Sequence, residues 1–296
     1  EMYSRVMYGD HPAGRVSATP ATLDAITRDA MVELHKTRYV PDHAVLAIAG
    51  DISMAEARRV IDVQLGRWQK AGTAAPTTSD PAMPPAGQVH FVARPNSVQT
   101  TLWVASPAIA RTSPDYDIVS VMNAVIGGGP TGRLFTHLRE EKGYTYGAYS
   151  NISAAQYRGN WLATMDVRTE VTDPALTDLM AEIARMRNEA VPTKEFDDKR
   201  RGMVASFALS LESPNAVLGN HITRWLYKLP ADYWDKLPDR IMAVTQAQVQ
   251  EAARKYLDPA RLHIVAVGDA TKIAETLKKF GAVATYEHGK SIAIMR

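Results

Sequence analysis

The segments ITRDAMVELHKTRYVPDHAVLAIAGD (residues 26–51) and VTQAQVQEAARKYLDPARLHIVAVGD (residues 244–269) resemble each other over their whole length. They align without a gap at a shift of 218 residues, as from Gly50 to Gly268, and Pro41 coincides with Pro259. Each pattern predicts a helix, a proline turn, a buried strand, a Gly-Asp pair and a further helix. Such a repeat indicates a duplicated domain, but helix–turn–strand is also a common local order, and the residues alone leave both open.

A duplicated domain would extend beyond the start of this chain. The second unit begins near residue 87, so its counterpart would begin about 130 residues before Glu1. We therefore expect residues 1–70 to be the C-terminal part of a first domain and residues 87–296 to be a complete second domain. Residues 71–86, AGTAAPTTSDPAMPPA, contain four prolines and almost no charge, a composition typical of an extended linker.

Strand and helix patterns occur in clusters after the linker. Strands are predicted at residues 87–95, 98–106, 144–153, 159–169 and 262–267, and helices at 114–126, 132–142 and from about 172 to 257. Because strands and helices do not alternate one by one, the pattern favours an α+β fold.

Composition and charge exclude several classes of protein. The chain has 296 residues, of which 46% are hydrophobic and 22% charged, as in ordinary globular proteins. A net charge of +2 without a Lys/Arg block gives no support for nucleic-acid binding. The absence of cysteine excludes disulfide scaffolds and cysteine-based zinc sites or nucleophiles. No apolar run approaches the ~18 residues that a membrane-spanning helix needs.

The histidines do not form a recognisable metal motif. No two of the eight are four residues apart, as a helical pair of zinc ligands requires. HLREE (residues 137–141) approaches the H-x-x-E-H motif, but Glu141 stands where the second histidine is needed. The sequence therefore predicts no zinc site within this chain.

LREEKGYTYGAYS (residues 138–150) is the strongest local feature. Arg139 lies near the end of a predicted helix, Gly143 ends that helix, and Tyr144 and Tyr146 would share one face of the following strand. A guanidinium and phenol hydroxyls could donate hydrogen bonds to a peptide carbonyl or to an oxyanion. The alternative is a surface Arg–Glu pair and two tyrosines that pack against a sheet, and spacing alone favours this alternative.

Several blocks of the chain resemble the pitrilysin/insulinase family of zinc peptidases. They are DHPAGR (10–15), residues 26–51, RTSPDYDIVSVMNAVIGGG (111–129) and GRLFTHLREEKGYTYGAYS (132–150). The resemblance implies two similar domains, each a sheet covered by helices, which face each other as a clamshell; the first would be truncated here. One departure is Pro130-Thr131-Gly132, where the family usually has an aromatic residue and a serine before Arg-Leu.

The resemblance also implies roles for individual residues. In the family, an H-x-x-E-H helix in the first domain binds zinc and supplies the general base, and these residues would lie upstream of Glu1. The second domain supplies an arginine and a tyrosine seven positions apart, which contact the substrate backbone and the oxyanion. That spacing selects Arg139 and Tyr146 as catalytic and substrate-binding residues. Tyr144, at the wrong spacing, packs or borders the cleft and is expected as a further substrate-binding residue. Zinc is therefore expected in the intact protein or its partner, and not in this chain.

Three functions follow from these observations. The first is the C-terminal part of a zinc metalloendopeptidase that hydrolyses peptides and is inactive alone. The second is a non-catalytic partner or structural subunit of the same family, and the third is a peptide-binding or assembly module without catalysis. The expected partners are a peptide substrate and either the missing N-terminal region or a catalytic partner chain, in a homo- or heterodimer. A periplasmic location is expected, with the cytoplasm left open.

Overall fold

The structure is a computed structural model that describes residues 1–72, 74–75 and 77–287. Its contacts divide the chain into two compact units. Unit 1 comprises residues 1–16, 80–204 and the chain from residue 236 onward, and unit 2 comprises residues 17–79 and 205–235. This grouping rests on spatial contacts alone, so the domain boundaries at residues 70 and 87 stay a prediction. Pro76, one of the linker prolines, lies outside the described residues.

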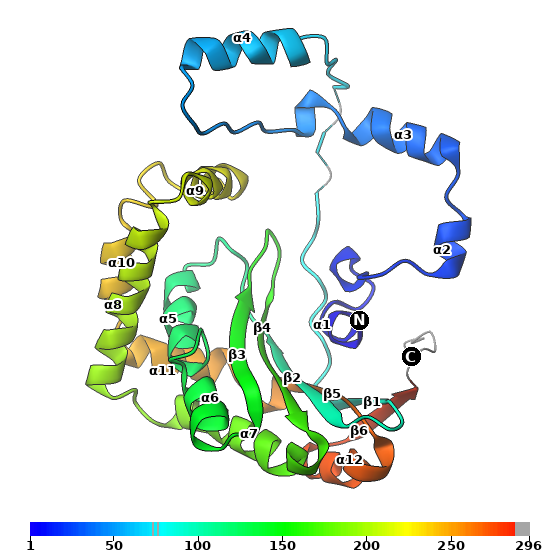
Figure 1. The fold of residues 1–296 in the computed structure, drawn as a ribbon, viewed down its shortest axis with the longest axis vertical. Coiled ribbons are helices and arrows are strands. Elements are labelled where there is room, and N and C mark those ends of the chain that lie inside the picture. Colours follow the sequence, from blue (N-terminus) through cyan, green and yellow to red (C-terminus); the bar gives the residue numbers. More distant parts are fainter. Residues whose placement is uncertain (73, 76, 288–296) are drawn as a thin grey trace. The chain divides into compact units, whose positions relative to one another are not determined.

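Unit 1 is built on a mixed sheet of six strands in the order β3-β4-β2-β5-β1-β6 (Figure 1). The strands are β1 Val89–Ala93, β2 Gln99–Pro107, β3 Thr145–Ser153, β4 Asn160–Arg168, β5 His263–Gly268 and β6 Val283–Glu287. β1 runs parallel to both β5 and β6, whereas β2 is antiparallel to β4 and β5, and β3 is antiparallel to β4. β3 and β6 therefore form the two edges of the sheet.

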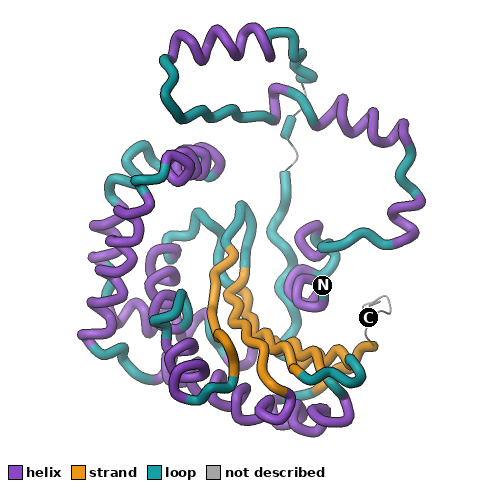
Figure 2. The backbone as a smooth tube through the Cα atoms, in the orientation of Figure 1, coloured by secondary structure: helices purple, strands orange, loops and turns teal. Residues whose placement is uncertain are grey.

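Helices cover one face of this sheet, as the α+β prediction and the family resemblance imply (Figure 2). The helices of the chain are α1 Met2–Tyr8, α2 Pro20–Asp24, α3 Arg28–Arg38, α4 Met54–Leu65, α5 Tyr116–Ile126, α6 Arg133–Phe135, α7 Thr172–Asn188, α8 Thr193–Ser210, α9 Pro214–Leu226, α10 Leu237–Ala243, α11 Gln246–Tyr256 and α12 Ala270–Leu277. Alternate strand residues such as Leu102, Val104 and Trp161 enter one core with α5, α7 and α11. Their neighbour Trp103 points to the opposite face, where Tyr3 of α1 contacts its ring.

The internal repeat is visible in the element bounds. α3 and α11 differ by the same shift of 218 residues at both ends, as do the 3₁₀ turns Pro41–His43 and Pro259–Arg261. The side chains of Thr27 and Thr245 each cap the helix that follows. The same helix and turn thus recur at one constant shift, as a duplication would produce.

The predicted strand at residues 44–49 is wrong. Residues 44–49 have no strand structure, and Val45, Leu46 and Ile48 are exposed. The counterpart segment is β5, which lies between β1 and β2 and is buried. A strand needs a neighbour to pair its backbone groups, and no described strand lies beside residues 44–49.

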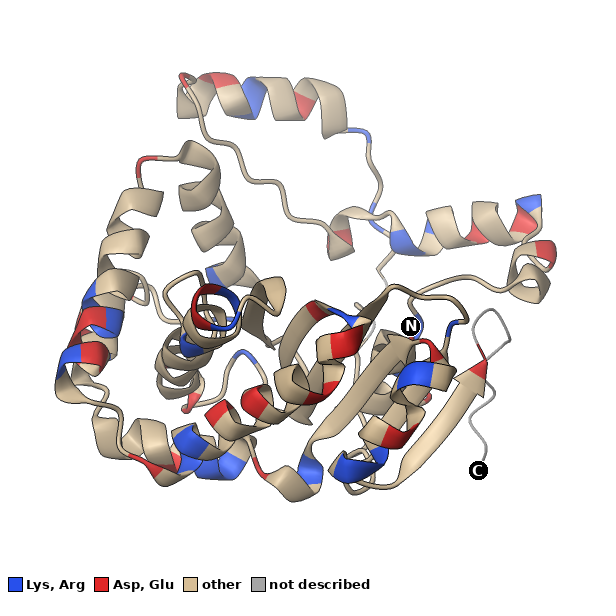
Figure 3. Ribbon diagram, turned by 60° about the horizontal axis from the view of Figure 1, so that its bottom comes forward, with Lys and Arg blue, Asp and Glu red and all other residues tan. Residues whose placement is uncertain are grey.

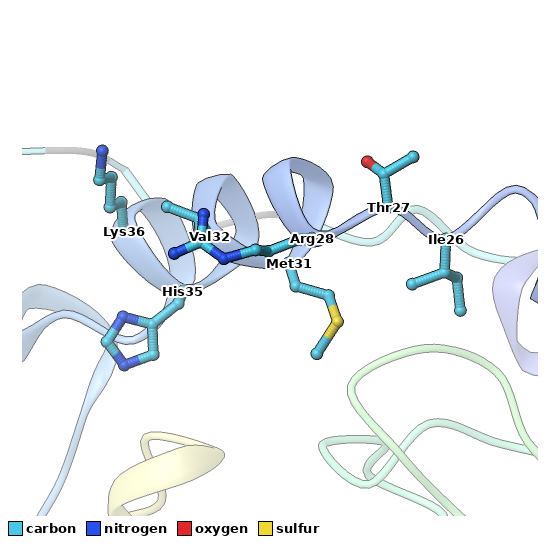
Figure 4. Close-up of a pocket in the computed structure, with 7 residues that line it drawn as sticks. All are labelled: Ile26, Thr27, Arg28, Met31, Val32, His35 and Lys36. Atoms are coloured by element: carbon cyan, nitrogen blue, oxygen red, sulfur yellow. The ribbon is translucent and has the colours of Figure 1, made fainter.

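The first copy also leaves its helix uncovered. α11 buries Val249 and Ala252 against α5 and α7, but the matching residues of α3, Met31 and Leu34, are 61% and 55% exposed. Figure 4 shows Ile26, Met31 and His35 on one side of α3, where they line part of a hollow of about 470 Å³. α3 thus has the apolar pattern of a helix that packs against other elements, but its apolar residues are exposed.

Two buried histidines join the central strands to the end of the linker. Nε2 of His90 lies 3.3 Å from Nδ1 of His263, and Nδ1 of His90 lies 3.2 Å from the Tyr286 hydroxyl. Nε2 of His263 lies 3.3 Å from the carbonyl oxygen of Pro85. Burial and the neighbouring His263 lower the pKa of His90 from 6.5 to about 4, and burial lowers the pKa of His263.

These depressed pKa values predict acid sensitivity. Below pH 6.5 His90 becomes protonated in the unfolded chain, whereas in the folded chain it stays neutral until about pH 4. Stability is therefore full above pH 6.5 and falls as the pH drops towards 4. Urea unfolding of the chain at stepped pH values should show this loss, and His90→Gln should have a shallower dependence. Equal slopes for both proteins would contradict the assignment to His90.

Candidate functional site

The segment between α6 and β3 carries the predicted site residues. The sequence predicted one continuous helix over residues 132–142, but the structure has a single α-helical turn, α6, followed by a π-helical segment at Thr136–Glu141. The Lys142 N–H donates to the carbonyl oxygen of His137, five residues earlier, at 3.0 Å. Gly143 then adopts a φ of 63°, which favours glycine and turns the chain into β3. π-helical turns are frequent at functional sites.

One ion pair holds α6, and two further contacts hold the π-helical segment that follows it. The guanidinium of Arg133 donates two hydrogen bonds of 2.8 Å to the carboxylate of Glu195 on α8. Nδ1 of His137 lies 3.0 Å from Oε1 of Glu182 on α7, and the side chain of Leu138 is fully buried. Arg139 is therefore a half-buried residue on a backbone that is fixed on both sides.

Tyr146 projects from a β-bulge at the start of β3. Between the pairs Thr145–Val167 and Ala148–Met165, β3 advances by three residues while β4 advances by two. The extra residue aims the Tyr146 side chain into solvent, where it is 89% exposed. Such exposure of an aromatic ring within a strand leaves its hydroxyl available to a ligand.

Tyr144 does not share this face. It precedes β3, follows the turn at Gly143, and packs against the main core as a half-buried side chain. The period of two that placed Tyr144 beside Tyr146 applies only within a regular strand, and the strand begins one residue later. The structure thus brings Arg139 and Tyr146 onto neighbouring segments that contact each other and directs Tyr144 inward. Their roles stay a prediction.

A groove of about 1130 Å³ lies along the same strand. Tyr149, Asn151 and Ser153 of β3 line it together with Trp103 of β2 and other residues of unit 1, including the glycines at 127–129. Among the described residues that line it, none is Asp, Glu, Lys, Arg or His. Sequence analysis did not predict this groove, because its walls come from segments that only the sheet brings together.

The described residues do not form a zinc site. Within residues 1–72, 74–75 and 77–287, no group of three or more His, Asp or Glu side chains is placed to hold a metal ion. His137 lies near Glu182 and Asp178, but Arg185 and Lys142 pair with these two carboxylates. The residues present therefore do not fit the metal that the family resemblance implies.

Helices carry charged side chains of both signs (Figure 3). On α7 the acidic residues Asp178 and Glu182 precede the basic residues Arg185 and Arg187 of its last turn. Among the described residues, no helix combines the length and the apolar character that crossing a membrane requires.

Known proteins resemble this chain along most of its length. An uncharacterized zinc protease of Streptomyces coelicolor is 26% identical over 269 residues, which cover 87% of this chain and 57% of the relative. The uncharacterized zinc protease YmxG of Bacillus subtilis is 25% identical over 259 residues, which cover 86% of this chain and 61% of the relative. The chain thus spans about three fifths of the length of these two relatives.

Solved structures show the same fold. A crystal structure of a peptidase M16 inactive domain from Pseudomonas fluorescens superimposes with a TM-score of 0.82 at 28% identity, covering 90% of this chain and 64% of that one. A protease from Helicobacter pylori superimposes with a TM-score of 0.80 at 15% identity, covering 90% and 65%, and at that identity the likeness concerns the fold alone. The family model described as peptidase M16 inactive domain matches residues 25–203. Because this match covers more than half of the chain, the chain belongs to the M16 (pitrilysin) family of peptidases, as a C-terminal inactive domain.

Proposed function

We propose that this chain is the C-terminal part of a zinc metalloendopeptidase and supplies substrate contacts through Arg139 and Tyr146. The observation that carries the proposal is the exposed Tyr146 on its bulge, one short turn after an arginine whose backbone is fixed. Relatives of similar sequence are named zinc proteases, which supports peptide hydrolysis as the reaction. The zinc would be held by the upstream region or by a catalytic partner chain.

The two side chains suit different parts of the reaction. The guanidinium of Arg139 presents several N–H donors in a fixed fork and can bind a backbone carbonyl of an extended peptide. The neutral hydroxyl of Tyr146 can donate to the oxygen that becomes negative when the scissile carbonyl is attacked. A donor that is already oriented stabilises this charge without reorganising during the reaction.

The first copy of the repeat exposes apolar residues, which supports a packing partner outside this chain. In the second copy, β1, β2, α5 and α7 cover β5 and α11. We propose that the corresponding surface of α3 and residues 44–49 packs against the upstream region, or against a catalytic partner chain in a homo- or heterodimer. Met31, Leu34 and Leu46 would then become buried, as their counterparts are.

A non-catalytic partner of the same family is the second candidate. A partner that completes the active site of another chain would also use Arg139 and Tyr146, and the lack of a metal group among the described residues agrees with either function. The upstream sequence separates the two, because an H-x-x-E-H motif there favours the enzyme and its absence favours the partner. The third candidate, a peptide-binding module, would bind peptides in the full-length, zinc-loaded protein without cleaving them.

The proposed reaction can be tested on the full-length protein. We expect purified, zinc-loaded protein to cleave a mixture of quenched fluorescent peptides, and a chelator to abolish the cleavage until zinc is restored. If the upstream sequence contains the motif and the zinc-loaded protein still leaves all peptides intact, the enzymatic function is excluded.

We predict that the 296-residue chain alone holds only substoichiometric zinc and cleaves none of these peptides, because its described residues offer no metal group. Elemental analysis of the purified chain, after dialysis against zinc-containing and then zinc-free buffer, measures this directly. One tightly bound zinc ion per chain would contradict the proposal that the upstream region or a partner chain holds the zinc.

A further inference from the structure

The bulge that presents Tyr146 is held by one buried hydroxyl group. Oγ1 of Thr145 donates to the carbonyl oxygen of Gly147 at 3.0 Å and accepts from the Gly147 N–H at 3.2 Å. Thr145 itself is buried, with 8% of its surface exposed. Both backbone groups of the residue after Tyr146 are therefore paired locally, where a regular strand would pair them with a neighbour.

A second contact supports the same backbone. A Cβ atom on Gly147 would lie 2.6 Å from the ring of Tyr149, so the ring covers this glycine closely. The Tyr149 ring in turn packs on Phe135 of α6, with ring centroids 5.4 Å apart. The bulge thus contacts both a hydroxyl group and an aromatic pair.

Register explains why loss of the bulge would move Tyr146. The later part of β3 is set by the burial of Ala148 and Ser150 and by their pairing with β4. A one-residue change of register there would turn these side chains to the wrong face. If the bulge relaxes, the backbone therefore changes conformation at residues 145–147, and the side chain of Tyr146 is displaced.

We infer that Thr145 is a positioning residue, whose hydroxyl group holds Tyr146 in the orientation that its contact with the substrate requires. The inference rests on the proposed function, since it acts through Tyr146. Displacement of a contacting group by about 1 Å can cost up to ~10²-fold in rate. The effect should appear mainly in kcat, because the hydroxyl of Tyr146 is proposed to act on the oxyanion, which exists only during reaction.

The test compares variants of the full-length enzyme in steady-state peptide cleavage. Thr145→Val keeps the shape of the side chain without the hydroxyl, and we expect kcat to fall about 10- to 100-fold with KM within about threefold. Thr145→Ser keeps the hydroxyl and should restore kcat to within about threefold of wild type. Thr101→Val is the matched control, because it removes a threonine hydroxyl that bonds Asp166 on the same sheet, and it should leave kcat unchanged. If Thr145→Val does not fold, Thr145→Ala against Thr145→Ser isolates the same oxygen atom.

A double variant separates this inference from the proposed function. If Thr145 acts through Tyr146, Thr145→Val added to Tyr146→Phe lowers kcat no further than Tyr146→Phe alone. The positioning role would be overturned if the kcat losses of the two single variants multiplied in the double variant. Wild-type kcat in the folded Thr145→Val protein, or equal losses in Thr145→Ser and Thr145→Ala, would also overturn it. Each of these results would leave the role of Tyr146 intact. Unchanged turnover in Tyr146→Phe would instead overturn the proposed function itself.

Discussion

Replacement of Tyr146 by phenylalanine should lower kcat of the full-length enzyme by about 10²- to 10³-fold, the usual cost of one oxyanion donor. The substitution removes a single oxygen atom from a side chain that is 89% exposed and outside the core. Folding and zinc content should therefore be unchanged. Steady-state cleavage of a quenched fluorescent peptide measures kcat, and elemental analysis of the same preparation measures the zinc content.

Tyr286→Phe is the matched control for this substitution. It removes a tyrosine hydroxyl from β6, at the opposite edge of the six-stranded sheet from β3, where that hydroxyl lies beside His90. We expect its turnover to equal that of the wild type. Wild-type turnover in Tyr146→Phe, or an equal loss in both variants, would exclude a specific oxyanion contact from Tyr146.

Replacement of Glu195 by alanine should destabilise the chain by about 3 kcal/mol, as expected when one partner of a buried ion pair is removed. The Arg133 side chain is only 7% exposed, and both of its hydrogen bonds to Glu195 measure 2.8 Å. Burial lowers the pKa of Arg133, but the hydrogen bond and charge of Glu195, together with the charges of Glu182 and Glu189, raise it overall. Without Glu195, the guanidinium would remain charged in a site that water barely reaches.

Urea unfolding of the 296-residue chain, followed by circular dichroism, measures this loss. The double variant Arg133→Met/Glu195→Ala should recover most of it, because no buried charge is then left without a partner. Glu275→Ala on α12, which removes an exposed ion pair with Lys278, should change stability by less than about 1 kcal/mol. A loss in Glu195→Ala no larger than that of Glu275→Ala would show that the Arg133–Glu195 pair does not stabilise the fold.

The local elements of unit 1 could be predicted from the sequence. Strands were predicted at the positions of β1, β2, β3, β4 and β5, and helix at the positions of α5, α7 and α11. These predictions succeeded because the rules involved concern residues two to four positions apart. The bounds of α3 and α11 repeat so closely because a threonine cap and a proline turn act within a few residues.

Predictions that depend on distant neighbours failed or were missing. Residues 44–49 have the composition of β5 but no strand beside them. The same pattern therefore forms a strand at β5 and no strand at residues 44–49. The π-helical segment and the bulge at Tyr146 were not predicted, because α7, α8 and β4 impose them from far along the chain.

The sequence by itself determined the α+β class, the repeated helix and turn, and the family resemblance, which implies the choice of Arg139 and Tyr146. Only the tertiary structure decided which tyrosine faces solvent. Tyr144 and Tyr146 are chemically alike and two residues apart, but the turn at Gly143 directs the first into the core and the bulge directs the second outward. The physical reason is that side-chain direction depends on strand pairing, and pairing is a property of two segments rather than one.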